Sequence, residues 1–243
     1  MTIPELFNRA LLLWRRAPDL LFRVASVFLF LPALAVMLFV PSIDLVGVPE
    51  EGVRDRMVQW FVANAPALSG ALLIELIGST TILVLLLAPE RPSVAEAMAR
   101  ALRLFPAMLV AWSVVFLIVM TGSFLFLLPG FYAAGRTMVT GAMLVTRPER
   151  GPFAAVADGI RRTRGHGWKL LVVTMAVLGA GQIAAAIVPV TDGRGDTALE
   201  VLEVVSAIAS AAASAVLSLA MTLLQVAAFQ LLPEAAEPPR QGE

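Results

Sequence analysis

Long apolar stretches are the feature that most constrains what this chain can fold into. Six of them follow one another along the 243 residues, at 24–40, 65–88, 107–128, 131–145, 170–190 and 204–232. A helix needs about 20 residues to cross a hydrocarbon layer of about 30 Å. Because these residues come in blocks and not as one stripe per helix, lipid is their expected surrounding. The sequence therefore predicts an all-α polytopic integral membrane protein with six transmembrane helices.

The overall composition also indicates that lipid surrounds the chain. Hydrophobic residues make up 59% of the chain and charged residues only 15%, against about 25% charged in soluble domains. The formal net charge is zero, which gives no reason to expect a nucleic acid partner. The chain has no cysteine, so disulfides, thiolate nucleophiles and thiolate metal sites are excluded.

The placement of basic residues predicts the orientation of the spans. With the N-terminus in the cytoplasm, the cytoplasmic segments hold 14 basic residues and the outside loops hold 3, while Arg136 falls within the fourth stretch. Basic loops tend to remain in the cytoplasm. The fourth stretch is short and follows Pro129-Gly130, so it could instead be a re-entrant piece or a continuation of the third. If it did not cross, the basic cluster of residues 147–169 would lie outside, so we predict six spans with both termini in the cytoplasm.

The apolar sequence of the first stretch continues past the triplet Ala33-Leu34-Ala35, which resembles a signal-peptide cleavage site. A signal peptide would become polar after that point, so we expect a retained first span. The predicted location is the bacterial inner membrane.

Three short amphipathic segments precede spans and share one register of apolar positions, i, i+3, i+4, i+7, i+8 and i+11. They start near Ile3, Val94 and Pro152, and the first two open with capping boxes, Thr2-x-x-Glu5 and Ser93-x-x-Glu96. We expect interfacial helices on the inner membrane surface. The chain then consists of one transmembrane domain, 1–232, with three repeated helix-plus-hairpin units, 1–88, 89–147 and 148–232, although convergent patterning would look the same. The tail 233–243 is polar and proline-rich and is expected to be disordered.

Glu75 is the acid placed deep within a span, in the second stretch. An ionised carboxylate there is costly unless it is paired or protonated, and Arg136 is the candidate partner. The pair would be a coupling site for a proton or an anionic headgroup, or else an interhelical clamp; Arg136 could also extend outward to the membrane surface.

Small residues form a stripe on each of the last two spans. Ser206, Ser210, Ser214 and Ser218 are spaced by four and share one helical face. Ala176, Ala180 and Ala184 form a similar stripe on the fifth span. Close packing of these two helices is the favoured interpretation.

The basic loop before the fifth span contains the single histidine, His166. One histidine cannot supply both a hydrolase triad and a metal site, and we predict no catalytic residues, no metal site and no cofactor. The loop is interpreted as a membrane anchor. The predicted headgroup contacts are Arg161, Arg162, Arg164, Trp168 and Lys169.

The stretch from Leu128 to Arg136, followed by a short span, Gly151 and the run from Thr163 to Lys169, resembles a known bacterial family. It is similar to the membrane domain that accompanies glycerophosphoryl diester phosphodiesterases, and to related polytopic proteins of unknown function. The resemblance covers mainly residues 93–190. It implies a helical membrane domain, and it implies no phosphodiesterase activity for these residues, because the soluble catalytic domain is not among them.

Two hypotheses of function follow. The first is a non-catalytic inner-membrane protein that organises or regulates a membrane partner, which could be another membrane protein or a second copy of itself, or the local lipid. The second is a small transporter or lipid-handling protein that uses Glu75 and Arg136.

Overall fold

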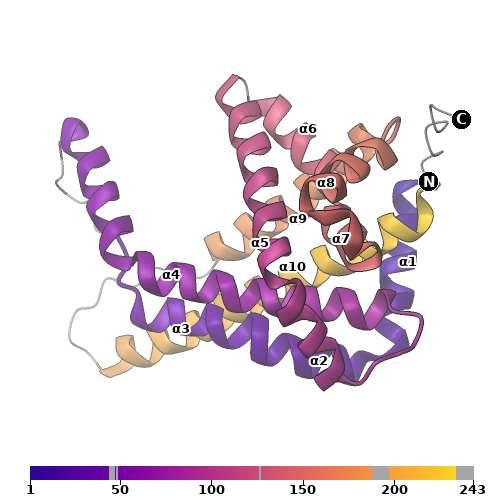
Figure 1. Ribbon diagram of the computed structural model, residues 1–243. Coiled ribbons are helices and arrows are strands. Elements are labelled where there is room, and N and C mark those ends of the chain that lie inside the picture. Colours follow the sequence, from indigo (N-terminus) through magenta and orange to yellow (C-terminus); the bar gives the residue numbers. More distant parts are fainter. Residues whose placement is uncertain (44–46, 48, 126, 188–196, 234–243) are drawn as a thin grey trace, which may run out of the picture.

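The computed structural model describes residues 1–43, 47, 49–125, 127–187 and 197–233, and these are built from helices and their connections (Figure 1). The elements, in chain order, are α1 Ile3–Arg16, α2 Pro18–Ala25, the π-helical turn η1 Ser26–Phe30, α3 Leu31–Phe39, α4 Glu50–Leu87, α5 Val94–Leu125, α6 Leu127–Thr137, α7 Thr140–Thr146, the 3₁₀ turn η2 Pro148–Arg150, α8 Gly151–Arg162, α9 Gly167–Ile187 and α10 Thr197–Leu231. The all-α prediction is confirmed for this part of the chain. The tail predicted to be disordered lies outside the described residues apart from Pro233.

Four helical stretches are long and apolar enough to cross a membrane: Pro18–Phe39, Glu50–Leu87, Val94–Phe124 and Val204–Leu231. They correspond to the first, second, third and sixth predicted spans. Their outer faces are not covered by protein, and Phe39 and Phe124 expose 82% and 96% of their surface. Apolar side chains of this kind are stable when lipid covers them. Length and composition of these four helices therefore support a multi-pass membrane protein.

The first span begins earlier than predicted, at Pro18, and continues through η1 into α3. Pro32 lacks an amide hydrogen and its ring would crowd the preceding turn of a regular helix. The helix widens just before it, and Leu31 N–H donates to the carbonyl of Ser26, five residues back. This π-helical turn lets the span continue past the proline.

Helix α4 has 38 residues, about 57 Å at 1.5 Å per residue, which is longer than a bilayer core. It begins at Glu50, well before the predicted start at residue 65, and it contains Pro66. Figure 1 shows that its first part leaves the line of the rest, as expected for a proline kink. The remainder of α4 runs alongside α3 and α10, and these helices are in mutual contact.

The three predicted interfacial segments differ in the structure. The first and the third are the separate short helices α1 and α8, whereas the second is continuous with its span in α5. Both predicted capping boxes are confirmed: Thr2 N–H donates to Glu5 at 2.7 Å and Ser93 N–H donates to Glu96 at 2.8 Å. The hydrogen bonds from Thr2 lower the pKa of Glu5. The prediction of a separate interfacial helix in the second unit was wrong, because α5 continues through Pro106 without a break.

The fourth predicted span is not one helix. Its residues divide between α6, which begins earlier at Leu127, and α7, with a break at Met138 and Val139. Helix α6 folds back against the end of α5, where Gly122 and Gly130 allow the two backbones to approach closely. Helix α7 then turns inward, and its residues from Thr140 to Leu144 are all buried. The chain thus returns from the end of α5 in two short, differently oriented pieces.

Several segments far apart in the sequence meet at one end of the molecule. Lys169 Nζ donates to the carbonyl of Met1 at 3.0 Å, and Arg9 Nε donates to Gln230 Oε1 at 2.8 Å. The end of α4, the start of α5 and the end of α7 also adjoin one another here. We call this the basic end; it comprises α1, residues 87–104, residues 145–169 and residues 229–232. The segments predicted to lie in the cytoplasm are therefore together.

Candidate functional site

Arg136 lies near the C-terminus of α6, and its guanidinium is bonded to the end of α8. Nη2 donates to the Ile160 carbonyl at 2.5 Å, Nε donates to Thr163 Oγ1 at 3.0 Å, and Nη1 donates to the Tyr132 hydroxyl at 3.1 Å. Thr163 Oγ1 donates in turn to the Arg136 carbonyl at 2.9 Å. The last carbonyls of a helix lack partners within it, and a cation there is favourable. Arg136 therefore joins α6 to the C-terminal end of α8.

Glu75 has a different partner. It is half-buried in α4, and its Oε1 accepts a hydrogen bond from Ser218 Oγ of α10 at 2.5 Å. The predicted pair of Glu75 and Arg136 is not formed. The prediction placed Arg136 inside a fourth span beside the second, whereas the break after α6 places it against α8 and α9. In the described structure, Glu75 is held by a hydroxyl and not by a cation.

The serine face of α10 is directed to α4 at Ser218. Ser206, Ser210 and Ser214 are half-buried on the same helix. Of the alanine stripe on α9, Ala176 and Ala180 are exposed, and the side chain of Ala184 lies outside the described residues.

The predicted packing of α9 against α10 is confirmed for the described residues. A Cβ on Gly181 of α9 would lie 2.9 Å from Leu217 Cδ1 of α10, so the glycine provides the space for that leucine. At this point of the contact, a glycine of one helix therefore faces a large side chain of the other.

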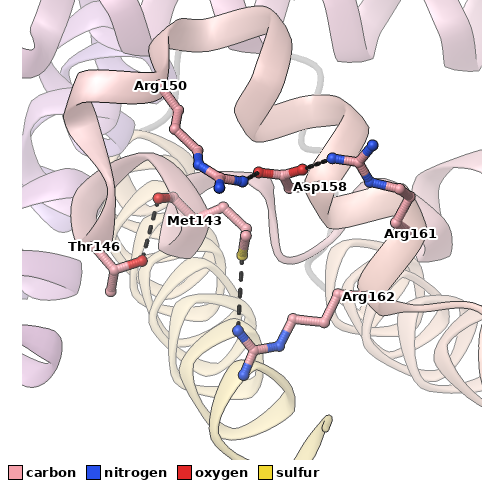
Figure 2. Close-up of polar contacts among 6 residues, drawn as sticks. All are labelled: Met143, Thr146, Arg150, Asp158, Arg161 and Arg162. Carbon is pink, nitrogen blue, oxygen red and sulfur yellow. Dashed lines mark hydrogen bonds and ion pairs between the residues drawn. The ribbon is translucent and has the colours of Figure 1, made fainter. Parts of the chain in front are cut away.

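Arg162, predicted to contact lipid headgroups, is directed into the protein. Nη2 donates to the carbonyls of Phe229 at 2.8 Å and Leu232 at 3.1 Å, at the C-terminal end of α10. The guanidinium carbon lies 4.1 Å from the centre of the Phe229 ring, and Nη1 lies 3.9 Å from Met143 Sδ (Figure 2). The prediction for Arg162 is corrected: the unpaired carbonyls of a helix end take its hydrogen bonds.

The other predicted headgroup contacts are at the surface. Arg161 and Arg164 are exposed, and Trp168 exposes 62% of its surface while its ring lies 5.4 Å from that of Tyr132. Lys169 is exposed but bonded to Met1, as described above. Arg164 and Trp168 thus retain the accessibility that a headgroup contact requires, and their lipid contacts stay a prediction.

Asp158 is a buried carboxylate that the sequence reasoning missed. It is 5% exposed in α8, and it lies between the guanidinium groups of Arg150, at 2.9 Å, and Arg161 (Figure 2). Burial alone would raise the pKa of Asp158, but the hydrogen bonds from both arginines hold it below its ordinary value of 3.8. The spacing of Asp158 and Arg161, three apart on one helix, was the available signal.

Within the residues that the structure describes, no group of three or more His, Cys, Asp or Glu side chains is placed to hold a metal ion. His166 is half-buried, and its Nδ1 atom is buried without a hydrogen-bond partner. Arg136 and Arg162 connect helix ends with other parts of the fold.

Comparisons with protein-family models, with curated proteins and with solved structures found no match. The resemblance to the membrane domain associated with glycerophosphoryl diester phosphodiesterases stays a prediction.

Proposed function

We propose that this chain is a non-catalytic protein of the bacterial inner membrane whose basic end binds anionic lipid and, through it, organises or regulates a membrane partner. The observation that carries the proposal is that the arginines at the basic end divide into two groups, those bonded to helix ends and those exposed at the surface. Some of them hold helix ends together, as Arg136 and Arg162 do, whereas Arg103 and Arg164 are exposed around the same buried core.

Exposed cations beside a transmembrane helix attract the anionic lipids of the cytoplasmic leaflet, with about 1 kcal/mol for each basic residue near the surface. The exposed ring of Trp168 has the amphipathic character typical of the interfacial layer. The cations bound to helix ends give this surface a rigid base, because their hydrogen bonds join α6 to α8 and α8 to α10.

Orientation and lipid preference test the proposal together. Reporter fusions near residue 50 should report the exterior, and those near residues 90 and 160 the cytoplasm. The purified protein should retain phosphatidylglycerol in preference to phosphatidylcholine when both are supplied in mixed micelles. An exterior location of residue 160, or equal retention of both lipids, would contradict the proposal.

A small transporter is the second candidate, and Glu75 is the observation that favours it. A half-buried carboxylate bonded to a hydroxyl, between two long apolar helices, is a costly arrangement that often accompanies ion or proton movement. Arg136 does not contribute to this site. Ion or proton flux into proteoliposomes, measured for the parent protein and for the Glu75→Gln and Arg136→Gln variants, separates the two candidates. Loss of flux in a well-folded Glu75→Gln variant supports transport. Absence of flux in the parent and in both variants supports the first proposal.

A further inference from the structure

A groove opens at the basic end between α4, α5 and α7. Its volume is about 460 Å³, within the range of about 300–1,000 Å³ that holds small ligands. Leu87 and Ala88 at the end of α4, Leu104 of α5 and Val145 of α7 contribute apolar lining. The groove therefore adjoins the end of α4, a helix that is long and apolar enough to cross a membrane.

Two arginines line the same groove. Arg100 and Arg103 are three residues apart and so share one side of α5. Arg100 is paired with Glu90 at 2.5 Å, with 45% of its side-chain surface exposed. Arg103 is exposed and makes no hydrogen bond or ion pair with the residues that the structure describes. The groove thus combines apolar walls with two cations: Arg103, which has no partner in the described part of the chain, and Arg100, which is paired with an exposed carboxylate.

We infer that this groove binds one anionic phospholipid, with the phosphate on Arg103 and Arg100 and the start of an acyl chain along Leu87, Leu104 and Val145. The inference rests on the proposed function, because it takes the basic end to face anionic lipid. It names the site and the lipid class that the proposal leaves open.

Charge and position favour a phospholipid over other occupants. A soluble phosphate ester would satisfy the arginines but would leave the apolar walls uncovered. An apolar helix of a partner protein would cover the walls, but it would also remove Arg103 from water without giving it a counter-charge, which is unfavourable. A phospholipid supplies both an anionic group for the arginines and an apolar chain for the walls.

Native mass spectrometry of the full-length protein in detergent, titrated with phosphatidylglycerol, phosphatidylcholine or glycerol phosphate, tests the inference. Arg103→Gln and Arg100→Gln should each weaken phosphatidylglycerol binding about fivefold, and the double variant about 25-fold. The matched controls Arg15→Gln and Arg16→Gln remove the same charge from α1 at the same end, outside the groove, and should change binding less than about twofold.

A second kind of variant distinguishes binding in the groove from a general electrostatic attraction of anionic lipid to the basic end. Ala88→Trp fills the groove and leaves every charge in place, so it should weaken phosphatidylglycerol binding as Arg103→Gln does. The variants should fold, because the pair of Arg100 and Glu90 is exposed and such pairs contribute little to stability. Circular dichroism checks this before each titration.

The outcomes distinguish this inference from the proposed function. Equal binding of phosphatidylglycerol and phosphatidylcholine by the parent protein would overturn both. A preference for phosphatidylglycerol that the groove variants leave unchanged would overturn the groove alone. Competition by glycerol phosphate at the concentration of the lipid would also overturn it, because the site would then recognise a free phosphate.

Discussion

Arg162, the last residue of α8, gives the sharpest test of how this molecule is held together, because it is bonded to the C-terminal end of α10. Arg162→Ala removes the hydrogen bonds to the carbonyls of Phe229 and Leu232 and the contact with the Phe229 ring. A hydrogen bond from a charged donor contributes about 1.5–3 kcal/mol, and a cation over a ring about 0.5–1 kcal/mol at exposed sites. The two bonds share one nitrogen and the side chain is half-buried, so values near the lower limits apply. We expect a loss of about 3 kcal/mol.

Hydrogen exchange of the α10 amides in lipid nanodiscs measures this loss where it arises. A loss of about 3 kcal/mol should increase the amide exchange rate in the last turns of α10 at least roughly 100-fold relative to the parent protein. Arg162→Lys keeps the charge but loses the planar group that reaches both carbonyls, and it should give an intermediate rate. Arg164→Ala, which removes an exposed arginine two residues along, is the matched control. Equal exchange in the Arg162→Ala and Arg164→Ala variants would refute the reasoning.

Three further predictions follow from the contacts. Ser218→Ala leaves the carboxylate of Glu75 without its hydroxyl donor, so it should lower the free energy of unfolding by about 1–3 kcal/mol in thermal denaturation, whereas Glu75→Gln, which keeps the acceptor, should lose less. The pKa of Asp158 is lowered in the folded protein, so its contribution to stability is present above pH 3.8 and is lost as the pH falls through the folded value; protection of α8 from exchange should be unchanged between about pH 7 and 5 in the parent, and Asp158→Asn should reduce it at both. Gly135→Ala places a Cβ 2.8 Å from a backbone nitrogen of α9 and should destabilise by about 1–3 kcal/mol, whereas Gly70→Ala, which meets no atom within 4 Å, should be neutral or stabilising in the same denaturation assay.

The spans were predictable where one property of the chain decides them. Lipid requires about 20 consecutive apolar residues, so a search along the sequence found the stretches that became Pro18–Phe39, Val94–Phe124 and Val204–Leu231, although the structure shifts their ends. The capping boxes were predictable for a similar reason, because Thr2 and Glu5 interact within one turn of helix.

The failures concern contacts between distant segments. Breaking the fourth stretch after Thr137 required knowledge of what α7 packs against, and this is distributed over α4, α5 and α8. The pairing of Glu75 with Arg136 depended on that stretch being straight. Once it is broken, the arginine lies at the end of α8 and the carboxylate finds Ser218. A charged residue within a long apolar stretch is predicted to need a partner, but its position in the sequence does not identify that partner.

The arginines at the basic end serve two purposes that a count of charges cannot separate. Orientation in the membrane depends on cations near the ends of the spans as the chain is inserted, so every one of them contributes to the cytoplasmic bias. In the folded protein, helix ends near the membrane surface have carbonyls that lipid cannot satisfy. Arg162 satisfies such carbonyls on α10 and Arg136 on α8, and neither remains available to a headgroup. Arg103 is not used in this way among the described residues, and the groove places apolar walls beside it.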